Sequence, residues 1–159
     1  MTIRLLSTTW ATVDRARQLT GEVLLCLFLV LMGTGIYSMT QPIPAFAPDG
    51  SLSSIYSMVS YYNARDGLLS RVLHGDVSTM LLAVAVVWAL LGRYGLGPVV
   101  FALGLLMTLV GNTWVHLVAA LVIAVILVRC SWQEARVNRR TWGFVAATLG
   151  LTAFLVVVI

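Results

Sequence analysis

The chain has 159 residues, of which 60% are apolar and 10% are charged, and its mean hydropathy is +0.96. Soluble domains are nearer to half apolar and a quarter charged, so this composition argues against a soluble enzyme and excludes an intrinsically disordered chain. The net charge of +4 comes from ten arginines and six acidic residues, without lysine. The arginines lie in short segments between apolar stretches, a distribution typical of membrane flanks and not of nucleic-acid binding.

The apolar stretches predict five transmembrane helices, because each is close to the ~20 residues that span a bilayer. The 34 residues from Leu96 to Arg129 would extend about 50 Å as one helix, which is more than a hydrocarbon core of about 30 Å. Gly111-Asn112-Thr113 is the turn-like cluster that divides this stretch. The helices are therefore expected at residues 20–39, 68–91, 96–111, 114–129 and 141–159.

The remaining segments complete the predicted organisation. Residues 1–19 read as an amphipathic segment lying at the membrane interface. Residues 20–130 hold the first four helices and an external loop at 40–67, whose second half has the composition of a short surface helix. Residues 131–159 hold a basic cytoplasmic loop and the fifth helix.

Arginines in short loops predict the orientation, because they favour the cytoplasmic side. Five helices with a cytoplasmic N-terminus keep most of them inside, whereas a four-helix alternative would export the cluster at 129–140. The predicted location is the cytoplasmic (inner) membrane of a bacterial cell. The arginines placed inside are Arg4, Arg15, Arg17, Arg93, Arg129, Arg136, Arg139 and Arg140.

The sequence has two histidines, His74 and His116, and each lies near the outer start of an apolar helix. In the predicted topology both lie at one depth, on the second and fourth helices. Two helices in this arrangement can hold one metal centre between their imidazoles, as in a haem iron with two axial histidines. The alternative is a pair of histidines that bind a neighbouring group or water, or that relay protons.

Two pairs of glycines have a spacing of 14 residues, which is close to four helical turns. Gly21 and Gly35 form one pair, and Gly97 and Gly111 form the other. Each pair leaves one stripe of its helix without side chains near both membrane surfaces, which suits a flat macrocycle. Ordinary packing of helices through small residues gives the same pattern.

Several segments resemble the N-terminal, haem-binding half of cytochrome b from bc-type quinol oxidoreductases. They are Leu-Thr-Gly-Glu-Val-Leu-Leu at 19–25, Gly-Thr-Gly-Ile-Tyr at 33–37, Ser-Ser-Ile-Tyr-Ser-Met at 53–58 and Gly-Leu-Leu-Ser-Arg-Val-Leu-His-Gly-Asp-Val-Ser-Thr-Met at 67–80. In that family a bundle of four helices holds two stacked haems between histidines of the second and fourth helices. The resemblance implies an all-α membrane protein whose first four helices form such a bundle.

The resemblance also implies roles for particular residues. His74 and His116 would ligate the outer haem and so bind its iron, Gly35 and Gly111 would border it, and Arg71 would pair with a propionate. Gly21 and Gly97 are the matching glycines at the inner level.

The departures from the family pattern imply a single haem b. The positions of the two inner-haem ligands hold Trp88 and Cys130 in this chain, and neither makes a bis-histidine site. The later helices of the family and its Pro-Glu-Trp-Tyr-type quinol motif are absent from the sequence. The short turn before His116 also places this ligand nearer to its helix start than the family pattern does.

The resulting hypothesis is a b-type cytochrome that serves as an electron-transfer subunit of a respiratory or related redox complex, rather than a complete enzyme. Its expected partners are other membrane subunits, an outer-side electron carrier, a quinone or quinol, and the lipid bilayer. A haem-free structural or assembly subunit on the same scaffold is the alternative. A quinone-reactive enzyme, with its site at the Arg15, Arg17 and Arg93 edge, ranks third, and haem content separates the first two hypotheses.

Overall fold

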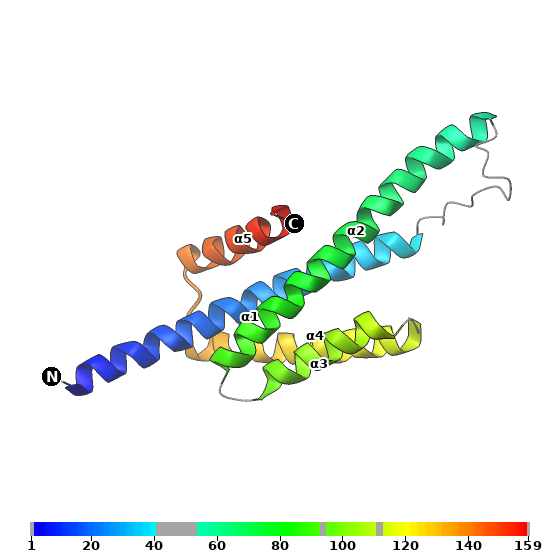
Figure 1. Cartoon of the computed structure of the whole chain (residues 1–159). Helices are drawn as coiled ribbons and strands as arrows, with labels where there is room; N and C mark the ends of the chain where they lie inside the picture. Colours follow the sequence, from blue (N-terminus) through cyan, green and yellow to red (C-terminus); the bar gives the residue numbers. More distant parts are fainter. Residues whose placement is uncertain (1, 41–53, 93–94, 111–112, 159) are drawn as a thin grey trace.

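The computed structural model describes residues 2–40, 54–92, 95–110 and 113–158, and every regular element in these ranges is an α-helix (Figure 1). The predicted all-α class is therefore confirmed for the part of the chain that is described. The helices are α1 (Thr2–Thr40), α2 (Ser54–Leu91), α3 (Leu96–Leu109), α4 (Thr113–Val137) and α5 (Trp142–Val157).

Two helices are longer than the sequence predicted. α1 runs without a break from Thr2, so residues 2–19 continue the first apolar segment instead of forming a separate helix. α2 begins at Ser54, so the second half of the expected external loop extends this helix, while its first half, residues 41–53, lies outside the described residues. Neither extension contains a proline, which is the residue that most strongly breaks a helix.

Three of the helices are long and apolar enough to cross a membrane. The segments are Thr12–Thr40, Leu69–Leu91 and Thr113–Val137. α3 and α5 are also apolar but have 14 and 16 residues, about 21 and 24 Å of helix, which is short of a hydrocarbon core of about 30 Å. The expected five membrane helices are thus present as helices, and three of them meet the length for a span.

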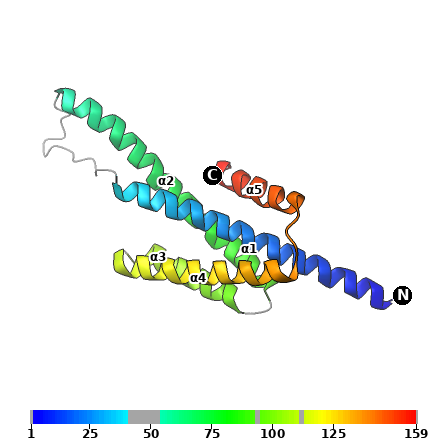
Figure 2. The same cartoon turned by 180° about the vertical axis from the view of Figure 1, so that it is seen from behind.

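The first four helices form a closed ring. α1 packs against α2 and α4, and α3 packs against the same two helices from the other side. α2 and α4 consequently lie across the diagonal of the ring. α5 packs against α1 on the side away from α3 and α4, as both views show (Figures 1 and 2).

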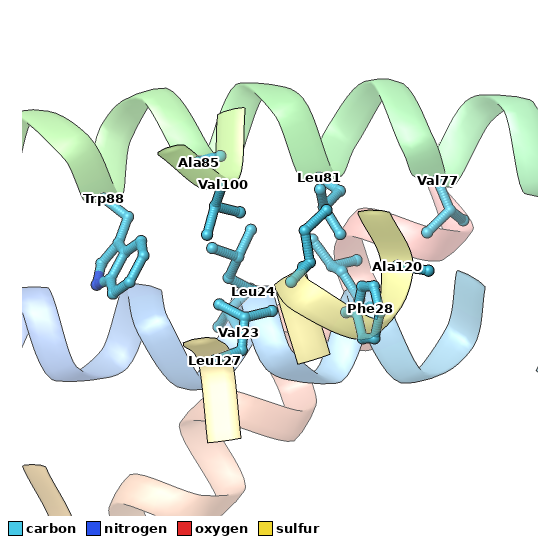
Figure 3. Close-up of a cluster of buried hydrophobic side chains, with 12 residues drawn as sticks. Val23, Leu24, Phe28, Val77, Leu81, Ala85, Trp88, Val100, Ala120 and Leu127 are labelled. Atoms are coloured by element: carbon cyan, nitrogen blue, oxygen red, sulfur yellow. The ribbon is translucent and has the colours of Figure 1, made fainter. Parts of the chain in front are cut away.

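The core of the ring is apolar, and so is much of its outer surface. Many of the outward aliphatic side chains are largely exposed, including Leu29 (61%), Leu90 (81%) and Val118 (61%). Monomers dissolved in water rarely show contiguous apolar surface of this extent, whereas a lipid-facing surface requires it. The core side chains, most of which are labelled in Figure 3, are Val23, Leu24, Leu27, Phe28, Val77, Leu81, Ala85, Trp88, Val100, Ala120, Ile123 and Leu127.

Polar contacts hold α1 to the opposite end of the chain. The Arg140 guanidinium donates to Glu22 Oε1 at 2.5 Å, and Ser131 Oγ donates to the same oxygen at 3.0 Å. Arg17 pairs with Glu134 at 3.0 Å, and the buried Gln18 side chain donates to a main-chain carbonyl at the end of α4. Because these groups are partly buried, each needs its partner, and together they link α1 to α4 and to the connection that leads to α5.

α2 and α3 approach closely at Gly97. A Cβ atom at this position would lie 2.7 Å from Ala89 Cβ and 2.8 Å from Ala89 N, closer than real Cβ contacts. The backbone turns into α3 through Gly95, which has a left-handed φ of 65°. A glycine at 97 therefore allows the short connection between the two helices.

We predict that Gly97→Ala destabilises the bundle by about 1–3 kcal/mol, because the added methyl group overpacks against the backbone of α2. Gly143→Ala is the matched control, since a Cβ atom there has no neighbour within 4 Å. Thermal unfolding of the protein in detergent measures both variants. Equal melting temperatures for the two would contradict the close approach.

Candidate functional site

The first four helices form a partly open cavity of about 560 Å³, which is within the range of about 300–1,000 Å³ that is usual for ligand sites. All four contribute to its wall, and most of the lining is aliphatic. Its polar lining residues are Ser38, Arg71, His74, Ser78, Thr108 and His116. The two histidines thus share one cavity, with His74 coming from α2 and His116 from α4.

The imidazole rings of His74 and His116 have centroids 6.3 Å apart, with their planes inclined by 36°. An imidazole nitrogen binds a metal at about 2 Å, and the ring centroid lies about 1 Å farther away, so two imidazoles on opposite sides of one metal have centroids about 6 Å apart. The observed separation therefore fits two axial ligands of one ion.

Thr34 orients the His74 ring. Its Oγ1 lies 3.1 Å from His74 Nδ1 and within hydrogen-bond distance of the main-chain carbonyls of Val30 and Leu31, at 3.0 and 3.1 Å. When the hydroxyl donates to one of these carbonyls, its oxygen accepts from Nδ1, which then carries the proton of the imidazole. This tautomer leaves a lone pair on Nε2, the form in which a histidine binds a metal.

Gly35 gives the His74 ring its space. A Cβ atom at Gly35 would lie 3.1 Å from His74 Cε1 and 3.5 Å from Nδ1, whereas one at Gly33 would have no neighbour within 4 Å. Gly35 also lines the cavity. This position is compatible with the predicted role of Gly35 beside a macrocycle. Its contact with the His74 ring is a second role, which the sequence pattern did not predict.

Arg71 lies at the cavity wall almost one helical turn before His74. A guanidinium at this position can form a paired, two-point contact with a carboxylate. Close to it, the hydroxyls of Ser38 and Ser70 are 2.9 Å apart and join α1 to α2. The cavity wall thus offers a cation for an acidic group beside the two imidazoles.

Within the described ranges, no three His, Cys, Asp or Glu side chains gather as they would around a metal ion held by protein alone. A haem iron has a different requirement, because the porphyrin occupies four of its positions and the protein supplies the axial ligands. The donor set, the cavity volume and the cation at its wall fit a haem.

The predicted site residues divide between the two ends of the bundle. Gly35, Arg71, His74 and His116 come together around the cavity, and Gly111 lies outside the described residues. Gly21 and Gly97 do not line this cavity. Instead, a Cβ atom at Gly21 would lie 3.1 Å from Trp88 Nε1, and Gly97 faces Ala89.

Trp88 occupies the opposite end of the core. Its side chain is 5% exposed, and its Nε1 has no hydrogen-bond partner within the described part of the chain; in Figure 3 the nitrogen faces away from the other core side chains. Trp88 and Cys130 line a second, smaller cavity of about 310 Å³ together with charged residues such as Arg17 and Glu134. An indole therefore fills part of the level at which cytochromes b of the family hold their second haem.

Sequence reasoning missed the role of Thr34. The residue lies between two glycines in the Gly-Thr-Gly segment that carries part of the resemblance, but threonines at helix positions usually bond to their own main chain. Its contact with a side chain 40 residues away depends on the register between α1 and α2, which the sequence pattern leaves open.

Comparisons with protein-family models, with curated proteins and with solved structures found no match to this chain. The resemblance to cytochrome b accordingly stays a prediction from the sequence segments that carry it.

We predict that Gly35→Val lowers the melting temperature of the protein in detergent, because the new side chain displaces the His74 ring or overpacks against it, at a cost of about 1–3 kcal/mol. Gly33→Val is the control, two residues away on the same helix and without neighbours within 4 Å. If the control is destabilised as much as Gly35→Val, the contact between Gly35 and His74 does not contribute.

Proposed function

We propose that this chain is a membrane-embedded b-type cytochrome that binds one haem b between His74 and His116 and serves as an electron-transfer subunit of a redox complex. The single observation that carries the proposal is the separation of the imidazole rings, 6.3 Å across one cavity. This separation, in a cavity that is lined by all four helices and by Arg71, is what two imidazole ligands of one iron require.

The residues of the chain have separate tasks in this proposal. His74 and His116 would supply the two nitrogens that hold the haem iron, and Thr34 would accept the hydrogen bond from Nδ1 of His74. Arg71 pairs with a propionate, and Gly35 leaves a flat surface. Bound haem with two protein ligands carries single electrons and has no open iron position for oxygen.

The proposal includes one haem rather than two. Trp88 is part of the packed core at the other end of the bundle, and Glu22, Glu134 and their arginine partners lie nearby as internal ion pairs. These contacts would have to be broken to admit a second macrocycle.

The arginines support an orientation. His116 lies in the first turn of α4, whereas Arg129 and Arg136 lie in its second half, so the cavity and the basic end are about 20–30 Å apart along the helix. If the basic end faces the cytoplasm of a bacterial cell, the N-terminus is cytoplasmic and the haem lies near the outer surface. The electron partner is then an outer-side carrier or a quinol within the membrane, and other membrane subunits complete the complex.

We predict that the purified wild-type protein contains haem. The haem content per chain should fall at least about tenfold in His74→Ala and in His116→Ala, because each substitution removes one ligand of the iron. Reduced-minus-oxidised absorption spectra with haem quantitation measure this. Val72→Ala, on the exposed side of α2, is the control. The variants His74→Gly and His116→Gly leave room for free imidazole. Added imidazole should restore their haem spectrum if haem is lost for want of the ligand and not because the fold is lost.

Retention of haem in both alanine variants would contradict the ligand assignment. Haem-free wild-type protein, purified under conditions in which other membrane cytochromes keep their haem, would instead favour a structural or assembly subunit.

We also predict that Thr34→Val weakens haem binding by about 10–100-fold, the usual effect of removing the partner of a histidine ligand. The midpoint potential of the remaining haem should rise, because the hydrogen bond to Nδ1 makes the ligand more basic and favours the oxidised iron. Thr34→Ser keeps the hydroxyl and should resemble the wild type in redox titration. An unchanged potential in Thr34→Val would exclude a role for Thr34 in positioning His74.

A further inference from the structure

One outward face of α4 is an open surface that the haem proposal does not use. All the residues that line it come from α4 itself, at the three- and four-residue spacing of one helix face. Toward the middle of the helix the lining is Ala124, Val125 and Val128, and toward the C-terminal end it is Arg129, Trp132, Gln133 and Arg136. The surface thus changes from aliphatic to basic along the helix.

The arginines of this face have no acidic partner among the described residues. The nearby Arg17 pairs with Glu134 and Asp14, and Arg140 pairs with Glu22, so the three carboxylates described at this end already have partners. In the described residues, Arg129 and Arg136 take part in no ion pair, and both are exposed. Two positive charges therefore remain on one face of the helix.

Trp132 lies between the two arginines and is 62% exposed. The guanidinium of Arg136 lies 5.5 Å from the centroid of the indole ring, a cation–π contact that holds it over the tryptophan. Tryptophan is favoured where the hydrocarbon of a bilayer meets its headgroups. The order along α4 therefore matches the order of a lipid molecule, with acyl chains beside the valines and the headgroup beside the arginines.

We propose that this face binds an anionic phospholipid of the leaflet at the arginine-rich end of the bundle. The phosphodiester accepts hydrogen bonds from the guanidinium groups of Arg129 and Arg136, which match its planar, two-point geometry. One acyl chain lies along Val125 and Val128. The unneutralised charge of the face selects an anionic headgroup, because a zwitterionic lipid brings its own cation.

Native mass spectrometry of the full chain in neutral detergent tests the proposal by titration with phosphatidylglycerol and with phosphatidylcholine of the same acyl chains. We expect the wild type to bind phosphatidylglycerol at least about fivefold more tightly, and Arg129→Gln and Arg136→Gln each to remove most of this preference. Arg139→Gln is the matched control, because it removes the same charge from an exposed arginine on the connection between α4 and α5.

Three outcomes would overturn the proposal: equal affinity of the wild type for the two lipids, a preference that survives both α4 substitutions, or an equal loss in Arg139→Gln, which would mean that only the net charge matters. Haem content is measured on the same samples and should not change in these variants. A failure of the lipid site is thus distinguishable from a failure of the haem proposal.

Discussion

The close approach of His74 and His116 across the diagonal of the helix ring is the constraint on which the functional account depends. These residues are 42 positions apart in the chain, and matching their depth depends on helix lengths. α2 descends about 26 Å from His74 to Leu91, and the short α3 rises about 21 Å before α4 begins with His116 in its first turn. A longer α3 would place His116 farther along the bundle axis than His74. The short length of α3 and the tight contact at Gly97 therefore set the two histidines at the same depth.

α1 supports both ends of the bundle by different means. Near the cavity it contributes Thr34, whose hydroxyl forms a hydrogen bond with His74 Nδ1, and Gly35, which leaves room for the imidazole ring. At the other end it contributes Arg17 and Glu22 to ion pairs with α4 and the following connection. Because an unpaired buried charge is expensive, these pairs hold α1 in one position along α4. The contact of Thr34 with His74 depends on the separate register between α1 and α2, which the bond between Ser38 and Ser70 also joins.

Much of the helix pattern could be predicted from the sequence, because apolar stretches and turn residues mark the ends of α3 and the start of α5. The extensions of α1 and α2 could not, since a change from polar to apolar composition does not bend a helix that lacks proline. The matched depth of the histidines followed from the topology, whereas the contact with Thr34 required the register between helices. The 14-residue spacing of the glycines did not predict what each glycine contacts: Gly35 borders the cavity, but Gly21 faces Trp88.

Absorption and electron paramagnetic resonance spectra of the purified wild-type chain, with its haem-to-protein ratio, measure whether His74 and His116 hold one haem. We expect one low-spin haem b per chain, with the signature of two imidazole ligands. A high-spin haem, a ratio near two, or a chain without haem after a preparation that preserves other membrane cytochromes would contradict this expectation.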